Sequence, residues 1–462
     1  MGSSTSSAGR RIEALLDEKS FVEIGSAIKA RATDFNPKPA DAPSDGVVTG
    51  YGTIEGERVY VYSQDASVLG GSVGEMHAKK ICAIYDLAMK SGAPVIGLID
   101  STGVRLSEST DALNALGEIY FKQAMAKGVV PQITAIFGGC GGGLALVPAM
   151  TDFCFMEEKN GHLFVNSPNA IEGNYTEKND TSAAKFQSEE SGNADFVGDA
   201  DSINAQIRAL VAILPQNDDD VAVIDSQDDL NRLTPDIAGA AGDTSILLSN
   251  IADDNDFLEV KSAYAKDMVC GFLRLDGVTV GCVANRSELV GDDGKVTKLS
   301  GHMSHKGAYK AADFVYFCDS FGIPVLTVTN VQGFEATLCS ERNIAKAAAT
   351  LTEAFANCDV PRVNLIVGKA YGSAYVAMNS KGIGADMVFA WPNAEIGPMD
   401  AKLAGKILAD GKNGGEIEKA AKEFAEKQNN VESAAARGYV DEIITPEETR
   451  KHLVYAFEML FE

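Results

Sequence analysis

The chain has 462 residues, of which 45% are hydrophobic and 23% charged, and its formal net charge at pH 7 is −25. This length allows two to four domains with sizeable cores. The negative charge disfavours nucleic acids and anionic membranes as partners, because both repel an acidic protein. No apolar run approaches the ~20 residues that a membrane-spanning helix needs, and no signal peptide is evident.

The cysteines and histidines give no metal-binding pattern. None of the eight cysteines forms a C-x-x-C pair, and most lie in apolar runs. We therefore expect buried free thiols in a reducing, cytoplasmic compartment. His302 and His305 stand three residues apart, but no further candidate ligands lie nearby. We expect no metal site.

The first half of the chain is predicted to alternate strands with helices. Residues 1–9 are rich in serine and are expected to form a disordered tail. The expected elements that follow are a helix over 10–19, a hairpin over 46–65, a helix over 75–90, a strand over 94–100, an apolar strand before a glycine-rich turn within 130–150, and a helix over 202–214. The polar stretch 166–200 has no clear period and is interpreted as an excursion. The acidic stretch 216–243 is interpreted as a linker.

The second half repeats this order. Aligning Pro131 with Pro361 gives an offset of 361 − 131 = 230, and the same offset pairs Gly138 with Gly368. The repeated elements are a hairpin over 269–285, a helix over 307–321, a strand over 324–330 and a strand and turn over 360–378. A strand over 387–391, a helical region over 401–428 interrupted near 411–415, a short helix over 432–437, a strand over 439–444 and a closing helix from 446 follow. We expect two α/β domains, residues 10–235 and 236–462, produced by tandem duplication.

Each copy places a turn of small residues after a buried strand. The first turn contains Gly142 and Gly143, and the second contains Gly372, Ser373 and Ala374. Small residues let a ligand approach the backbone, and converging N–H groups suit an oxyanion. A tight turn without chemistry is the alternative for one copy, but two copies at one spacing favour a functional role. Two oxyanion sites suit carboxyl transfer between two enolate-like partners.

Eight motifs in chain order make the sequence resemble the carboxyltransferase subunit of biotin-dependent acyl-CoA carboxylases, of the propionyl-CoA carboxylase β-chain type, and the related decarboxylases and transcarboxylases. The motifs are RIEALLDEKSFVEI, SQDASVLGGSVGEMHAKKI, GGCGGG, GFLRLDGVTVGCVAN, FCDSFGIPVLTVTNVQGF, VGKAYGSAYVAMNSK, AWPNAEIGPM and AARGYVDEIITPEETR. The resemblance implies an α/β fold made by tandem duplication of crotonase-like ββα-spiral domains. It places acyl-CoA at the first domain and biotin at the second. It also implies a homohexamer whose active site lies between the first half of one subunit and the second half of a partner.

The resemblance also assigns the two turns. By position, Gly142 and Gly143 match the first oxyanion hole of the family, and Ser373 and Ala374 match the second. Analogy with crotonases places the thioester at the first hole and biotin at the second. Further substrate-binding candidates at the turns are Gly141, Tyr371, Gly372 and Val376, of which Val376 occupies a position linked to substrate choice.

Three basic residues are candidates for contacts with CoA. Arg105 matches a family position and is a candidate CoA or carboxylate contact, with a surface ion pair to Glu108 as the alternative. Lys79 and Lys80 are candidate contacts for the CoA phosphates, with a role near the C-terminal end of a helix as the alternative.

The activity implied by the resemblance is carboxyl transfer between carboxybiotin and the α-carbon of a short-chain acyl-CoA, propionyl-CoA or methylmalonyl-CoA first. Biotin is expected on a separate carrier, because the chain has no Met-Lys-Met-like attachment sequence. The expected partners are a biotin carboxyl carrier protein and a biotin carboxylase subunit.

Two other activities compete. One is the same subunit in a biotin-dependent decarboxylase, with membrane subunits that form a sodium pump. The other is a crotonase-fold serine hydrolase with Ser373 as nucleophile, but no histidine accompanies Ser373. The chain also departs from the family, because residues 332–337 read QGFEAT where Pro-Gly-Phe-Leu-Pro-Gly is frequent.

Overall fold

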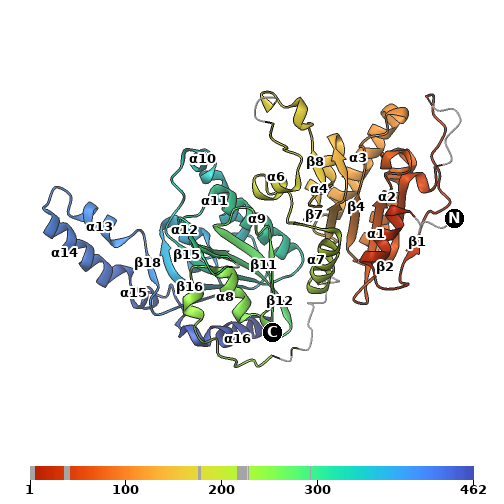
Figure 1. Ribbon diagram of the computed structural model, residues 1–462. Coiled ribbons are helices and arrows are strands. Elements are labelled where there is room, and N and C mark those ends of the chain that lie inside the picture. The colour runs from red at the N-terminus through yellow and green to blue at the C-terminus, as the bar shows by residue number, and fades with distance from the viewer. Residues whose placement is uncertain are drawn as a thin grey trace. The chain divides into compact units, whose positions relative to one another are not determined.

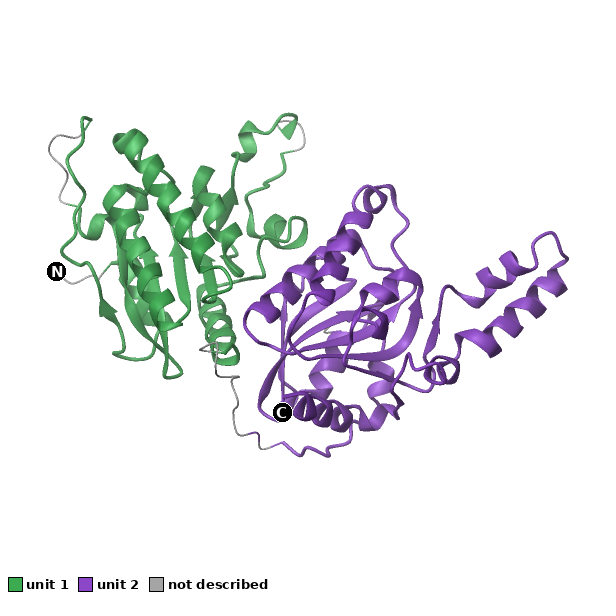
Figure 2. Cartoon of the chain, turned by 180° about the vertical axis from the view of Figure 1, so that it is seen from behind, with its two compact units in different colours: residues 1–220 green, residues 221–462 purple. Residues whose placement is uncertain are grey.

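The computed structural model describes residues 6–35, 42–174, 178–215, 226, 228–291 and 293–461. The chain divides into two compact units, residues 1–220 and 221–462 (Figure 2). This division falls inside the acidic stretch that the sequence suggested as a linker. Each unit contains one large sheet with helices packed against it (Figure 1).

Unit 1 is built on a seven-stranded sheet in the order β1-β2-β3-β4-β5-β7-β9. Strands β1 to β3 pair antiparallel, and the pairs from β3 to β9 are parallel. The strands are β1 (Val22–Glu23), β2 (Val47–Ile54), β3 (Glu57–Gln64), β4 (Val95–Ile99), β5 (Gln132–Ile136), β7 (Phe153–Glu157) and β9 (Phe196–Gly198), and β6 (Gly139–Gly141) pairs with β8 (His162–Phe164) beside them. The helices are α1 (Ser7–Leu15), α2 (Glu75–Ser91), α3 (Ser109–Ala126), α4 (Leu146–Met150), α6 (Ala184–Glu189) and α7 (Ala200–Ile213).

Unit 2 repeats this sheet in the order β10-β11-β12-β15-β16-β17-β19, with the short β18 paired to the end of β16. The strands are β10 (Phe257–Val260), β11 (Met268–Leu275), β12 (Val278–Asn285), β15 (Val325–Val331), β16 (Arg362–Tyr371), β17 (Met387–Ala390), β18 (Glu395–Gly397) and β19 (Glu442–Ile443). The helices are α8 (Thr244–Ile251), α9 (His305–Ser320), α10 (Leu338–Glu341), α11 (Ile344–Ala356), α12 (Gly372–Ala377), α13 (Ala401–Leu408), α14 (Gly414–Phe424), α15 (Val431–Ala435) and α16 (Thr449–Phe461). The same strand order in both units confirms the predicted duplication.

The two hairpins follow from their turn residues. In unit 1 the turn between β2 and β3 places Glu55 at φ 52° and Gly56 at φ 87°. In unit 2 the turn between β11 and β12 places Asp276 at φ 53° and Gly277 at φ 76°. Positive φ at both central residues gives the twist that flanking antiparallel strands need, and glycine adopts it without strain.

Buried helix faces form the cores. In unit 1, α2 and α3 contribute Ile81, Tyr85, Leu116 and Ile119 to a cluster with the sheet. In unit 2, α8 and α16 pack on the sheet, and α9 packs against α11. Seven of the eight cysteines are buried free thiols, as predicted, and Cys339 is exposed. Within the described ranges, no helix has the length and apolar character needed to cross a membrane.

Several predicted boundaries were wrong. Helix α1 begins at Ser7, because the Ser6 hydroxyl accepts a hydrogen bond from the Gly9 N–H at 3.0 Å and caps the helix. Residues 6–9 therefore belong to the fold rather than to a disordered tail, and residues 1–5 lie outside the described part of the chain. The stretch 166–200 contains α6 and also β9, which completes the sheet of unit 1. It is only partly an excursion.

The second part of the expected linker belongs to unit 2. Arg232 bonds Asp228 and the Asn250 carbonyl oxygen, and the Thr234 N–H donates to the Glu447 carbonyl oxygen at 2.9 Å. The sequence analysis also assigned no structure to the long helices α3 and α11, nor to a small hairpin of β13 (Glu288–Val290) and β14 (Val296–Lys298). The interruption between α13 and α14 was predicted, and these helices form a hairpin that projects from the sheet of unit 2 (Figure 1).

Candidate active site

The first turn follows strands β5 and β6, which pair with β7 and β8, respectively. Gly142 has φ +63°, and a Cβ built on it would meet no atom within 4 Å. Glycine is needed here for its backbone conformation rather than for lack of space. Gly143 is exposed, and its carbonyl oxygen accepts a hydrogen bond from the Tyr120 hydroxyl on α3. The hydrogen bond from Tyr120 therefore fixes the backbone of this turn, while Gly143 itself is exposed to solvent.

The second turn follows β16 and begins with a glycine of the same φ. Gly372, 230 residues after Gly142, also has φ +63°. Ser373 is exposed, as Gly143 is, and the carbonyl oxygen of Pro398 lies 3.3 Å from the Cβ that Gly372 lacks. Two turns that begin with a positive-φ glycine and lead into a helix stand at equivalent places in the two units.

Side chains at the strand ends explain the glycine before each turn. A Cβ on Gly138 would collide with the Asp100 carboxylate, and a Cβ on Gly368 would lie 2.6 Å from the Asn330 amide oxygen. The Asp100 carboxylate pairs with Arg11 at 2.6 Å, and the Asn330 amide oxygen accepts from the Lys369 N–H at 3.1 Å. Both copies thus have an oxygen-bearing side chain at this place, which is the charged carboxylate of Asp100 in unit 1 and the neutral amide of Asn330 in unit 2.

The register of the second turn changes the interpretation of Ala374. Residues 230 apart pair Gly143 with Ser373 and Leu144 with Ala374. The side chains of Leu144 and Ala374 are both 1% exposed. We expected a small side chain at Ala374 because a ligand approaches it, and this was wrong, since its methyl group packs into the core. Ser373 is the exposed counterpart of Gly143.

The candidates Gly141 and Tyr371 also occupy equivalent positions. A Cβ on Gly141 would lie 2.5 Å from the Phe164 ring, which comes from the partner strand β8. In unit 2, Tyr371 is buried and its strand partner is Gly397. Each copy therefore pairs a glycine with an aromatic residue at this place. In unit 1 the glycine precedes the turn and the aromatic residue lies on the partner strand, and in unit 2 the two are exchanged. The Tyr371 hydroxyl donates to the Glu395 carboxylate, and burial together with this carboxylate raises the pKa of Tyr371.

Arg105 lies in a buried ion-pair network. Its guanidinium contacts the Asp45 carboxylate at 2.6 Å and the Glu108 carboxylate at 2.8 Å, and it donates to the Ser72 carbonyl oxygen at 2.7 Å. Burial raises the pKa of Asp45, and the Arg105 charge opposes that rise. The pair with Glu108 was predicted as a surface interaction, but the Arg105 side chain is only 6% exposed. The arginine joins three segments of unit 1.

Lys80 and Lys310 are equivalent buried lysines. Lys80 donates to the carbonyl oxygens of Ser44, at 3.2 Å, and Val47, and burial lowers its pKa to about 8. Lys310 donates to three carbonyl oxygens, including that of Met268 at 2.8 Å. The hairpin of unit 2 follows the hairpin of unit 1 by 221 residues, and at this spacing Met268 corresponds to Val47. The duplicated contact gives Lys80 a structural role, whereas Lys79 is exposed and pairs with Glu75 at 2.8 Å.

Comparison with known proteins identifies the family. The family model described as carboxyl transferase domain matches residues 3–462. The propionyl-CoA carboxylase beta chain of Roseobacter denitrificans is 42% identical over 98% of this chain and 90% of the relative. The methylmalonyl-CoA decarboxylase subunit alpha of Propionigenium modestum is 38% identical over 98% of this chain and 90% of the relative.

The chain belongs to the carboxyl transferase family. A solved structure of transcarboxylase 12S, a hexamer with hydrolysed methylmalonyl-CoA bound, agrees with this chain at a TM-score of 0.91 and 36% identity, over 98% of this chain and 89% of that one. The expectations of an acyl-CoA carboxyltransferase and of a crotonase-like fold are confirmed. The structure neighbour and the relatives support a biotin-dependent reaction that involves partner proteins.

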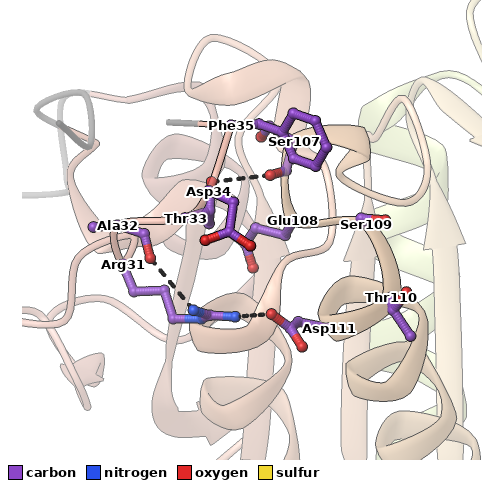
Figure 3. Close-up of a pocket in the computed structure, with 10 residues that line it drawn as sticks. All are labelled: Arg31, Ala32, Thr33, Asp34, Phe35, Ser107, Glu108, Ser109, Thr110 and Asp111. Carbon is purple, nitrogen blue, oxygen red and sulfur yellow. Dashed lines mark hydrogen bonds and ion pairs between the residues drawn. The ribbon is translucent and has the colours of Figure 1, made fainter. Parts of the chain in front are cut away.

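This carboxyltransferase has a polar pocket near the start of α3. The pocket has a volume of about 500 Å³ and is lined by residues 31–35 and 107–111. Figure 3 shows these residues. Arg31 forms ion pairs with Glu75 and Asp111, and Thr33 Oγ1 donates to the Ser107 carbonyl oxygen at 3.0 Å. Among the described residues that line it, Arg31 carries the only guanidinium, and this group is already paired.

The remaining candidate, Val376, is 41% exposed on α12, close to the second turn in the chain. Sequence reasoning missed Arg31 and Lys369. Nothing in the sequence marks Arg31. Lys369 carried a usable signal, since the first turn has Gly139 at the equivalent position.

Proposed function

We propose that this carboxyltransferase moves a carboxyl group between carboxybiotin and the α-carbon of a short-chain acyl-CoA, with propionyl-CoA and methylmalonyl-CoA as the first candidates. The observation that carries this proposal is the pair of equivalent turns that begin with a glycine of φ +63°, Gly142 and Gly372. Relatives named as a carboxylase chain and as a decarboxylase subunit match over equal shares of the chain. The decarboxylase is therefore the second candidate, and the same two turns serve either direction.

Each turn is assigned one oxyanion. Carboxyl transfer breaks a bond between the carboxyl carbon and a ureido nitrogen and forms a bond to the α-carbon, or the reverse. Negative charge develops on the ureido oxygen in one half of the reaction and on the thioester oxygen in the other. Backbone N–H groups of residues 142–143 face the thioester, and those of residues 373–374 face the ureido group. One such donor contributes about 3–4 kcal/mol of transition-state stabilisation.

No side-chain base is assigned. Neither turn carries a histidine, and the Tyr371 hydroxyl is held by Glu395 with a raised pKa. When carboxybiotin is bound, its ureido nitrogen would supply the base for the α-proton, so the chain itself needs none. This division of labour leaves the protein to position the two partners and to stabilise their oxyanions.

The partners follow from the same proposal. Biotin is held by a separate carrier protein, the carboxyl group comes from a biotin carboxylase subunit, and the assembly is a homohexamer like the transcarboxylase 12S neighbour. Among the basic candidates, Lys79 is the one whose side chain is exposed, and we assign it to the CoA phosphates, for which it would exchange its surface ion pair with Glu75. Arg105 and Lys80 instead stabilise the fold of unit 1 through their buried contacts.

An exchange assay tests the proposal. Purified protein is mixed with methylmalonyl-CoA labelled in its free carboxyl group and with free biotin, without ATP. Labelled carboxybiotin and propionyl-CoA should form in equal amounts, and a streptavidin blot of the pure chain should be blank. Exchange that requires ATP, or no exchange with any of malonyl-, methylmalonyl- and ethylmalonyl-CoA, would contradict the assignment.

A further inference from the structure

A lysine stands next to the second turn and has no equivalent beside the first. Lys369 lies at the end of β16, three residues before Gly372, and is half-buried. The residue 230 positions earlier is Gly139, where a Cβ would lie 2.8 Å from the Ser101 carbonyl oxygen. The first copy therefore has no room for a side chain at this place, and the cation belongs to the second turn alone.

The ammonium of Lys369 is not neutralised by the acid nearest in the sheet. Glu395 is its direct partner in the parallel pairing of β16 with β18. The Glu395 carboxylate accepts a hydrogen bond from the Tyr371 hydroxyl, and it does not come within 4.0 Å of Lys369 Nζ. Among the residues that the structure describes, Lys369 forms no ion pair, although the protein carries a net charge of −25. Its ammonium group is therefore open to an anionic ligand.

Within the described residues, the one side-chain hydrogen bond of Lys369 is long and leaves hydrogen-bond donors free. Lys369 Nζ donates to Gln332 Oε1 at 3.4 Å, and Gln332 Nε2 donates to the Ser300 carbonyl oxygen at 3.5 Å. Gln332 is exposed on the loop after β15. An ammonium group has three N–H donors, so at least two remain for a ligand that enters from this side.

We propose that Lys369, steadied by Gln332, binds the carboxylate group that this enzyme transfers. This inference rests on the proposed function and names a residue for its donor substrate. The donor is an anionic carboxylate carried either on biotin or on a malonyl-type CoA, and the ammonium forms a charge-assisted hydrogen bond with it. When the bond to the carboxyl carbon breaks, its electron pair stays on the ureido or enolate group, and the carboxyl carbon leaves as neutral CO₂. The attraction to Lys369 then ends, while the N–H groups of the turns gain an oxyanion.

The proposal predicts a change in binding rather than in the chemical step. Lys369→Met should weaken the carboxylated donor by roughly 10- to 100-fold, the scale of one hydrogen bond between charged groups, and leave kcat within about threefold. Lys369→Arg keeps the charge and should recover most of the loss. The control is Lys412→Met, which removes an exposed lysine of the same unit from the turn between α13 and α14.

Two measurements on the full-length assembly separate the sources of the carboxylate. Calorimetry compares methylmalonyl-CoA with propionyl-CoA, which differ by the carboxylate, and kinetics compare carboxybiotin on its carrier with free biotin. If Lys369→Met weakens methylmalonyl-CoA but not propionyl-CoA, the carboxylate bound is that of the CoA donor. If it raises only the KM for carboxybiotin, the carboxylate is that on biotin. Either result supports the proposal.

Other outcomes overturn it. Equal weakening of both CoA esters would give Lys369 a general role in CoA binding or folding. Unchanged affinity for both carboxylated donors, or the same losses in Lys412→Met, would show that Lys369 does not recognise the substrate. Exchange by the wild-type protein is scored separately, so a wild type that moves no carboxyl group refutes the proposed function. The binding comparison of the two CoA esters still decides whether Lys369 recognises a carboxylate.

Discussion

Adding a bulky side chain to one turn at a time should distinguish the roles of the two proposed oxyanion sites. Gly143 and Ser373 are equivalent, exposed positions, so the matched changes are Gly143→Val and Ser373→Val. Neither residue has a positive φ, and valine is therefore compatible with the backbone at both places. A Cβ on Gly143 would lie 3.0 Å from Leu116 Cδ2 and 3.1 Å from the Tyr120 hydroxyl, both of which are side-chain ends. We expect a loss of about 1 kcal/mol or less in the free energy of unfolding.

The effect on activity should be much larger. A branched side chain at either position keeps an oxyanion away from the backbone N–H groups. Loss of one such donor costs about 3–4 kcal/mol, which corresponds to a rate decrease of roughly 10²- to 10³-fold. Gly143→Val should act on the acyl-CoA reaction, and Ser373→Val on the use of biotin.

Steady-state exchange kinetics, with acyl-CoA and free biotin varied separately, measure both effects. Circular dichroism and thermal melting check that each variant is folded. Ser373→Ala is the control, because it removes the hydroxyl but adds no bulk, and it should retain near-normal activity. A folded Ser373→Val protein with normal exchange would refute the two-site reasoning. Inactive Ser373→Ala would instead favour the serine nucleophile of the competing hydrolase hypothesis.

Three further predictions concern the packing around the site. Ala374→Val should overpack the core and lower the free energy of unfolding by about 1–3 kcal/mol, measured by urea denaturation, whereas an unchanged midpoint would mean that this methyl group has free space. Arg105→Met should cost about 3–5 kcal/mol in the same assay because it leaves Asp45 and Glu108 buried without their cation, and a loss below 1 kcal/mol would show that water reaches them. Burial lowers the pKa of His77 to about 3, below its unfolded value near 6.5, so His77 stabilises the fold fully above pH 6.5 and this contribution is lost as the pH falls toward 3. His77→Gln should flatten this dependence by up to about 2 kcal/mol between pH 6.5 and 5, in denaturation curves at each pH, and an unchanged slope would show that another group titrates.

The sequence predicted the two turns well because their constraint is local. Gly142 and Gly372 have a positive φ, a backbone conformation that few other residues adopt. Gly138 and Gly368, four residues earlier, leave no room for a Cβ. The hairpins were predicted for the same reason, since Gly56 and Gly277 have positive φ. Such signals survive in one chain without any knowledge of its neighbours.

The roles of the basic residues could not be predicted in the same way. Arg105 stands near a strand end, as a substrate contact would, but its partner Asp45 comes from a segment 60 residues earlier. Lys79 and Lys80 are adjacent in sequence, yet successive residues on a helix point about 100° apart, so one is exposed and the other buried.

The sequence by itself determined the duplication, the α/β class, the position of both turns and the family. These depend on residue order, hydrophobic pattern and glycine conformation, which are written in the chain locally. Only the tertiary structure decided which small residue faces solvent, because Ser373 and Ala374 differ in burial rather than in size class. It alone also showed that Glu395, the acid beside Lys369 in the sheet, accepts a hydrogen bond from Tyr371 and forms no ion pair with the lysine. Burial and pairing depend on segments distant in the chain, and no local pattern records them.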